Sequence, residues 1–344
     1  MPAGRNYGVG EHSSLPPESR PKFVETSGET TAVRVPPPHR GGPVVSAVSG
    51  RRTFDLDDVR IHALTWGDPG APLVLCLHGY PDTAWTWRHL APRLAGEGYY
   101  VLAPFTRGYG PSTIPRTGDL SVGALVADAL DLASLAGSAD AVLIGHDWGA
   151  ITANTIAAMR DSPFRRIVAL AVPPLGSLTP ERGRRAAQLP QILLQSVNSW
   201  YIMVNQLPVL PEKVFERMTA FLWRTWSPGY DASEDLRYLA ESVQDSAQRS
   251  AVIGYYRSFV RPHRLSDRHA AFQNYVMAAP RQPTLQLHGL SDGCLRPQLF
   301  DIARGRLASG SRTVPVSGAG HFLHLEQPVL VGDLIAEYIG AAGT

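Results

Sequence analysis

The stretch "VLIGHDWGA", residues 142–150, decides the fold of this chain of 344 residues. A short apolar run ends at Gly145, Asp147 stands two residues later, and a helix-like segment begins near Gly149. The pattern Gly-x-Ser-x-Gly at such a junction marks a nucleophile elbow, a sharp strand-to-helix turn that presents its central side chain above a sheet. Here the central residue is aspartate. The stretch therefore predicts an α/β sheet with Asp147 exposed at one edge.

Short apolar runs rich in Val, Leu and Ile recur along the chain, and they suit strands that are buried on both faces of a parallel sheet. Helix-like stretches separate them. The segment 121–137, for example, repeats apolar residues every three or four positions and ends at Gly137. This alternation predicts a doubly wound, mostly parallel α/β sheet. The runs, besides 141–147, are 72–79, 99–105, 166–173, 283–289 and 312–318, with an alternating, antiparallel pair at 52–57 and 59–67.

Three regions of different composition predict the domain organisation. Residues 1–50 are rich in proline and lack apolar periodicity, so we expect a disordered N-terminal tail. Residues 51–174 and 276–344 carry the strand–helix alternation and form the predicted core. Residues 175–275 lack strand-like runs and contain helical stretches rich in Trp, Tyr, Gln and Arg. We expect this interval to be a helical lid over the carboxyl edge of the sheet, where open α/β sheets bind ligands.

The overall composition excludes several classes of protein. The net charge is +2 with acids and bases intermixed, which argues against a dedicated nucleic-acid surface. No apolar run reaches the length of about 18 residues that a membrane span needs. With only two cysteines and no secretory signal at the N-terminus, the expected location is cytoplasmic. The oligomeric state is open, a homodimer included.

Two further residues complete a catalytic pattern with Asp147. Asp292 follows the predicted strand 283–289, and His321 follows the last predicted strand in a glycine-rich turn. The order nucleophile, acid, histidine is the order of the triad in nucleophile-elbow folds. Singly, each residue has an ordinary explanation: Asp147 as a helix cap, Asp292 as a turn former and His321 as a satisfied polar group. Their joint placement after strands favours a triad.

A turn near the start of the core predicts an oxyanion hole. "LHGYP", residues 77–81, follows an early strand and would place the backbone N–H of Tyr80 beside that of Trp148. His78 is expected to bond loop backbone. An aspartate at the elbow, beside a helix N-terminus, needs no base to be nucleophilic at neutral pH, because its usual pKa is about 3.9.

The predicted lid carries tyrosines in two aromatic stretches, "SWYIMVNQLP" at 199–208 and "GYYRSFVRP" at 254–262. Tyrosines often fill cores as amphipathic side chains. Two phenols that face a carboxylate nucleophile would instead donate protons to an oxygen that the nucleophile displaces.

Together these motifs resemble the epoxide hydrolase family of α/β-hydrolases, which is related to the haloalkane dehalogenases. The resemblance covers roughly residues 52–340. In the family, one lid tyrosine comes from each aromatic stretch, and the matching positions here are Tyr201 and Tyr256, with Tyr255 the neighbour most easily confused with Tyr256. The motifs are "HGYP" (78–81), "RGYGPS" (107–112), "GHDWGA" (145–150), "SWY" (199–201), "YYR" (255–257), "GLSDGC" (289–294) and "GHF" (320–322).

The resemblance implies a two-step reaction that needs neither cofactor nor metal. Tyr201 and Tyr256 would bind the epoxide oxygen, and Asp147 would attack an epoxide carbon to form an ester. The lid is rich in apolar and aromatic residues, so the expected substrate is an apolar epoxide.

In the second implied step, His321, oriented by Asp292, would activate water against the ester carbonyl of Asp147. The N–H groups of Tyr80 and Trp148 would hold the oxyanion, and the product would be a vicinal diol.

The chain departs from the family at two places, and two other functions stay open. Phe105 and Thr106 replace a common Asp-x after Pro104, and Pro173-Pro174 replaces a common His-Pro, which affects the expected pocket shape. A haloalkane or haloacid dehalogenase would use the same triad, with the Trp148 indole at a halide site. A ligand-binding protein that retained the fold without turnover is the third possibility. The paired tyrosines favour the epoxide.

Overall fold

The computed structural model describes residues 48, 50–137, 140–178, 180, 182–261 and 264–340. Within them, eight strands form one sheet in the order β1-β2-β4-β3-β5-β6-β7-β8. β1 and β2 form an antiparallel pair, β2 is also antiparallel to β4, and all other neighbours are parallel. The predicted mostly parallel sheet is therefore confirmed. The strands are β1 (Gly50–Asp55), β2 (Arg60–Trp66), β3 (Leu73–Leu77), β4 (Tyr100–Pro104), β5 (Ala141–His146), β6 (Phe164–Leu170), β7 (Thr284–Gly289) and β8 (Arg312–Val316).

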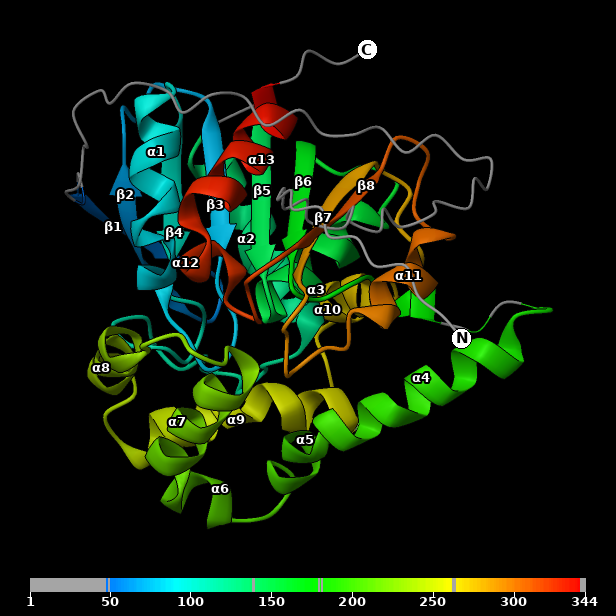
Figure 1. Ribbon diagram of the computed structural model, residues 1–344. Coiled ribbons are helices and arrows are strands. Elements are labelled where there is room, and N and C mark those ends of the chain that lie inside the picture. Colours follow the sequence, from blue (N-terminus) through cyan, green and yellow to red (C-terminus); the bar gives the residue numbers. More distant parts are fainter. Residues whose placement is uncertain are drawn as a thin grey trace, which may run out of the picture. The chain divides into compact units, whose positions relative to one another are not determined.

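Helices cover both faces of this sheet (Figure 1). α1 packs against α13 on one face, and α2 packs against α3 on the other. Every residue of β3, β4, β5 and β7 is buried, which explains why these strands are continuous apolar runs rather than alternating ones. The helices of the core are η1 (Ala84–Arg88), α1 (Leu90–Gly96), α2 (Val122–Leu135), α3 (Trp148–Ala157), α11 (Gln298–Arg304), α12 (Leu323–Glu326) and α13 (Pro328–Gly340).

Between β6 and β7 the chain is helical, and most of these helices lie beyond the edge at which the parallel strands end (Figure 1). The last of them, α10, packs instead against α2, where its Gln273 side chain accepts a hydrogen bond from the Gly123 N–H. The helices are η2 (Leu175–Leu178), α4 (Arg185–Asn198), α5 (Trp200–Val204), α6 (Leu210–Lys213), α7 (Phe215–Trp226), α8 (Ser233–Ser242), α9 (Ser246–Val260) and α10 (Asp267–Gln273).

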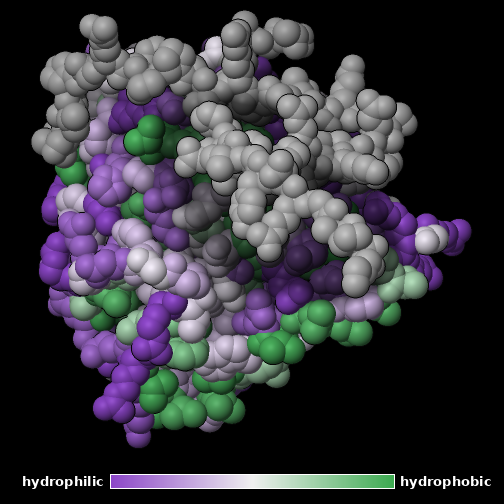
Figure 2. Space-filling model, viewed as in Figure 1, coloured by the Kyte–Doolittle hydropathy of each residue, from purple (hydrophilic) through white to green (hydrophobic). Residues whose placement is uncertain are grey.

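The surface of these lid helices is not uniformly polar. Figure 2 shows hydrophobic side chains along the outer edge of α4, next to hydrophilic surface at its beginning. Among the described residues, no helix combines the length and the apolar character that crossing a membrane requires. The predicted tail, residues 1–50, lies outside the described residues except for Val48 and Gly50.

Candidate active site

Asp147 stands on the turn between β5 and α3, and the backbone there is strained. Its φ of 53° and ψ of −113° are rare for a residue other than glycine. A Cβ atom on Gly145 would lie 2.0 Å from the Gly149 carbonyl oxygen, so glycine is required for the strand and the helix to pass this closely. The predicted nucleophile elbow is present, but the prediction that Asp147 is exposed is wrong: its side chain is buried, because the Tyr80 turn and the segments that carry Tyr201 and Tyr256 lie beside it.

Asp292 and His321 come from the loops after β7 and β8 and meet at Asp147. His321 Nδ1 lies 2.9 Å from Asp292 Oδ2. The other oxygen of Asp292 accepts hydrogen bonds from the N–H groups of Cys294, at 2.7 Å, and Leu295, at 2.9 Å, which fixes the carboxylate in place. His321 Nε2 has no hydrogen-bond partner and lies 3.7 Å from Asp147 Oδ2. The structure thus brings the three predicted triad residues together.

The charges around His321 favour the imidazolium form. Burial lowers the pKa of this histidine, but the carboxylates of Asp292 and Asp147 outweigh burial and raise the pKa to about 10. Both carboxylates must keep their charge for this effect to last. Any reaction that neutralises Asp147 would therefore lower the pKa of His321.

The loop that carries His321 is held from two sides. The His321 backbone N–H donates to the carbonyl oxygen of Trp226, the last residue of α7, at 2.9 Å. Its carbonyl oxygen accepts a hydrogen bond from His146 Nε2, at 3.0 Å, at the end of β5. The histidine is therefore positioned jointly by a lid helix and by the strand that precedes the nucleophile.

The two N–H groups that are predicted to form an oxyanion hole, those of Tyr80 and Trp148, lie next to Asp147. The Tyr80 N–H donates to Asp147 Oδ1 at 2.8 Å. A Cβ atom on Gly79 would lie 2.3 Å from the same oxygen and 2.7 Å from the Trp148 nitrogen, so both N–H groups border this point and glycine leaves the space open. The two donors can therefore serve an oxygen attached to Cγ of Asp147.

His78 has the structural role expected from the sequence. Its Nδ1 donates to the Gly79 carbonyl oxygen at 2.9 Å, and its Nε2 accepts from the Thr106 N–H at 3.1 Å. Burial lowers the pKa of His78 to about 4, so the ring is neutral and can both donate from Nδ1 and accept at Nε2. It joins the oxyanion turn to the loop after β4, where Phe105 is buried.

Tyr201 of α5 and Tyr256 of α9 face the triad from the lid. Their rings are perpendicular with centroids 5.4 Å apart, and both side chains are buried. Burial, with the Asp147 carboxylate nearby, raises both pKa values well above the usual range of tyrosine, so both phenols keep their protons. The Tyr256 hydroxyl adjoins that of Tyr201 without a well-aligned partner. Two protonated phenols thus lie next to each other and within the electrostatic influence of Asp147.

The adjacent Tyr255 has a different role. Its hydroxyl donates to the Arg107 carbonyl oxygen at 2.6 Å, within the core. The assignment of Tyr256 rather than Tyr255 to the site therefore agrees with the geometry.

Hydrogen bonds from side chains to backbone carbonyl groups join α9, which carries Tyr256, to the residues just after α5, which carries Tyr201. Gln206, just after α5, donates from Nε2 to the Tyr256 carbonyl oxygen at 3.0 Å. Arg257 donates to the carbonyl oxygens of Asn205, at 3.0 Å, and Leu207, at 2.8 Å. These bonds set the position of one phenol relative to the other.

Sequence reasoning missed a thiol in the site. Cys294 is buried, and its sulfur lies 3.5 Å from the Tyr201 hydroxyl. The "GLSDGC" motif contained it, but its contact with a lid tyrosine depends on the position of α5. Asp292, Cys294 and His321 place potential ligand atoms within 4.8 Å of one another, although the carboxylate and His321 Nδ1 are already bonded to each other.

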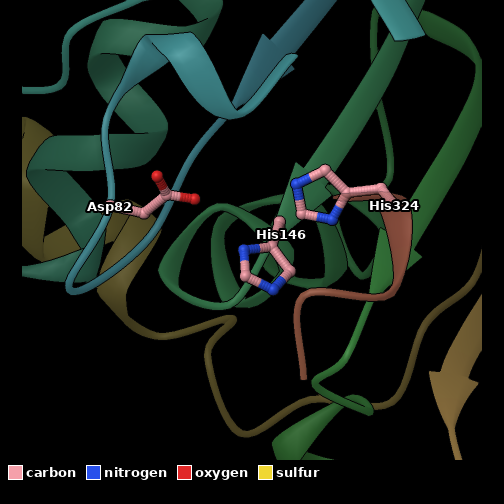
Figure 3. Close-up of side chains that lie close together, drawn as sticks. All are labelled: Asp82, His146 and His324. Atoms are coloured by element: carbon pink, nitrogen blue, oxygen red, sulfur yellow. The ribbon is translucent and has the colours of Figure 1, made fainter. Parts of the chain in front are cut away.

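A second buried polar cluster, also missed, consists of Asp82, His146 and His324 (Figure 3), and the ring centroid of His146 lies 4.9 Å from that of His321. Burial lowers the pKa of both histidines, and burial with the nearby Asp235 raises that of Asp82 to about 8. Neutral imidazoles and a carboxylate are ligand types that Zn²⁺ accepts. However, the Nε2 atoms of His146 and His324 already bond the His321 carbonyl and, at 2.6 Å, the Thr86 hydroxyl. The cluster therefore supports the His321 loop.

The chain is similar to known proteins over most of its length. The chain is 29% identical to epoxide hydrolase A of Mycobacterium tuberculosis over 325 residues, covering 84% of this chain and 96% of that protein. It is 27% identical to epoxide hydrolase 4 of Mus musculus over 292 residues, covering 82% of this chain and 76% of that protein. The crystal structure of epoxide hydrolase A from Mycobacterium thermoresistibile has a similar fold, with a TM-score of 0.65, 24% identity, and coverage of 85% of this chain and 98% of that one.

The sequence pattern of the alpha/beta hydrolase fold family matches residues 72–328, which include the elbow, the lid and the loops of Asp292 and His321. The chain belongs to the alpha/beta hydrolase fold family.

Proposed function

We propose that this protein hydrolyses apolar epoxides to vicinal diols through an ester on Asp147. The observation that carries the proposal is an aspartate, rather than a serine, on the nucleophile elbow, with two protonated phenols near enough for its charge to raise their pKa values. Similarity to epoxide hydrolases over most of the chain supports the reaction class.

In the first step, a carboxylate oxygen of Asp147 attacks an epoxide carbon. The new O–C bond forms as the C–O bond of the epoxide breaks, and the electron pair stays on the leaving oxygen. Tyr201 and Tyr256 bind this oxygen, and one of them transfers its proton to it. The high pKa of both phenols keeps them protonated until the oxygen becomes strongly basic.

Forming the ester also prepares the second step. Asp147 loses its charge, so only Asp292 continues to raise the pKa of His321. The pKa of His321 then falls, so the imidazolium releases its Nε2 proton to solvent and the ring becomes a neutral base. His321 removes a proton from water as the water oxygen attacks Cγ of Asp147. The N–H groups of Tyr80 and Trp148 stabilise the oxyanion.

Collapse of this intermediate restores the enzyme. The bond from Cγ to the alkyl oxygen breaks, and the departing alkoxide takes the proton from His321. The second proton of the water, left on the carboxyl group, returns to the phenolate. When Asp147 recovers its charge, His321 takes a proton back from solvent. One water is consumed, one diol is released, and every side chain regains its starting form.

Aspartate suits this chemistry better than serine does. A serine would need deprotonation by the histidine, and attack on a saturated carbon would give an ether, which resists hydrolysis. An aspartyl ester is cleaved by a histidine and an oxyanion hole. The elbow residue therefore favours alkylating substrates over esters and amides.

The surroundings favour an apolar substrate. The aromatic rings of Trp148, Tyr201 and Trp226 line the space around Tyr256 and His321. Both cysteines are buried free thiols, which supports a reducing location such as the cytoplasm as part of this proposal.

The decisive experiment measures diol formation from styrene oxide and stilbene oxide beside halide release from haloalkanes, with Asp147→Ala as the control. Diol without halide, lost in the variant, is the expected result. Halide without diol would make the protein a dehalogenase, in which the buried, unpartnered Trp148 Nε1 would face the halide. Diol formation by Asp147→Ala would overturn the covalent mechanism.

A further inference from the structure

Helix α4 packs on the protein with its polar face inward. Gln188 is buried, although α4 lies at the surface. Gln195 donates from Nε2 to the Cys294 carbonyl oxygen at 2.7 Å, and its Oε1 accepts from the Arg296 N–H at 3.0 Å. Gln191 accepts a further hydrogen bond from the Arg296 guanidinium at 3.3 Å. The glutamine face of the helix is thus its attachment to the loop after Asp292.

The outer face of α4 is apolar. Leu189, Leu193 and Val197 recur every four residues and are 47%, 61% and 69% exposed. A helix at the surface of a globular protein normally turns such a stripe toward the core. The stripe continues into α5, where Trp200 is 42% and Met203 65% exposed. A contiguous exposed apolar surface of this kind marks an interaction site.

The charged residues within this segment of the chain have one sign. Arg182, Arg184 and Arg185 stand at the start of α4, and no acidic residue occurs from Arg182 to Val204. Glu181 precedes them, outside the described residues. Figure 2 shows the hydrophilic surface at this end of α4 and the hydrophobic surface along it. The next acid along the chain, Glu212, is bonded to Arg257 at 2.6 Å.

We propose that this face of α4 and α5, here called the docking face, lies on the surface of an anionic lipid bilayer. An apolar stripe with arginines beside it and a tryptophan among its apolar residues has the composition of interfacial helices. A second copy of the chain would bring the same cations and no acid from this segment, so charge complementarity favours anionic headgroups. With 14 residues, α4 is about 21 Å long. Because its glutamine face is bonded to the protein, α4 would lie in the plane of the membrane–water interface.

The position of the docking face gives this contact a use. α5 carries Tyr201 on its buried side and Trp200 and Met203 on its exposed side. The bilayer would therefore lie against the outer side of the element that supplies a proton donor to the site. Apolar molecules dissolved in the bilayer would be concentrated at the lid. The docking itself is independent of the reaction.

The test is sedimentation of the full chain with vesicles of phosphatidylcholine, with and without phosphatidylserine. We expect binding to the anionic vesicles, lost in Leu193→Glu/Val197→Glu. Val329→Glu is the matched control, because Val329 is 72% exposed on α13, away from the docking face, and this variant should bind like the parent. Arg182→Gln/Arg185→Gln should weaken anionic binding by about 25-fold, or about fivefold for each arginine near an anionic surface.

Two further measurements keep the outcome decisive. Brominated lipid should quench tryptophan fluorescence less in Trp200→Phe than in the parent protein. Epoxide turnover in lipid-free buffer should be unchanged in Leu193→Glu/Val197→Glu, which would show that the variant is folded. Failure of the parent protein to bind anionic vesicles would overturn the proposal, as would equal binding by the two glutamate variants. A dimer that Leu193→Glu/Val197→Glu dissociates, without vesicle binding, would assign the docking face to a second copy.

Discussion

His321 Nε2 lies 3.7 Å from Asp147 Oδ2, beyond the distance of a hydrogen bond, whereas its other nitrogen is bonded to Asp292. His321 is therefore hydrogen-bonded to Asp292 but not to Asp147. This asymmetry leaves Nε2 available to a water molecule and leaves Asp147 free to attack a substrate.

Replacing His321 with Gln should separate the two steps. The variant should still form the ester, because Asp147 and both tyrosines are intact, but should not hydrolyse it. Mass spectrometry of the peptide that contains Asp147 should show an increase equal to the substrate mass. Asp147→Ala is the control and should show none. An unmodified peptide in His321→Gln, with substrate bound, would count against the covalent route.

The pKa of His321 predicts a pH dependence of stability. Its folded pKa of about 10 lies above the ordinary 6.5, so protonation stabilises the folded state. This contribution is complete below about pH 6.5 and is lost as pH rises toward 10. Denaturant unfolding of the parent protein and His321→Gln, followed from pH 6 to pH 10, should show the parent losing more stability. Parallel curves would mean that the two carboxylates do not raise this pKa.

Asp292→Asn should slow ester hydrolysis by on the order of 10⁴-fold, the loss known for the equivalent change in a serine-histidine-aspartate triad. The Asn carbonyl can still accept from the Cys294 and Leu295 N–H groups, so the fold should survive. Its amide would face His321 Nδ1 as a donor and impose the wrong tautomer. Single-turnover kinetics should show alkylation much less affected than hydrolysis. Equal losses in both steps would contradict this role.

Tyr201→Phe/Tyr256→Phe should slow alkylation by about 10²–10⁴-fold, the usual contribution of general acid catalysis. Each single variant should lose less, because one phenol remains. Tyr255→Phe offers a matched control: it removes a buried hydroxyl bonded to the Arg107 carbonyl, so it should lower stability but spare alkylation. Rapid-quench measurement of the ester tests all four variants. Normal alkylation in the double variant would place the acid elsewhere.

Much of the site follows from short sequence patterns because it is built from strand ends. Asp147 and Asp292 follow fully buried strands and His321 follows β8, which is mostly half-buried, and the ends of parallel strands meet at one edge of the sheet. Glycines at the elbow mark the close backbone contact. The positions of these residues therefore depend little on details of packing.

The remainder depends on how helices rotate and dock. Tyr255 and Tyr256 are adjacent in α9, and only the orientation of that helix decides that one bonds Arg107 and the other faces Tyr201. Periodicity indicates that α4 is amphipathic. The usual rule that apolar residues face the core would have predicted the opposite orientation of this helix, with its glutamines exposed. α10 lies within the predicted lid interval, yet it packs on α2. Such choices are tertiary and leave no local signal.

The hydrogen bonds that join the end of α5 to α9 have a consequence for thermal inactivation. The two phenols belong to different helices, and their alignment depends on a few hydrogen bonds from Gln206 and Arg257 to backbone carbonyls. The triad, by contrast, is anchored to the eight-stranded sheet. On heating, ring opening should fail while the sheet is still intact, so loss of catalysis would precede melting. Strengthening the contact between α5 and α9 would then raise the temperature at which the enzyme loses activity, without any change to the core.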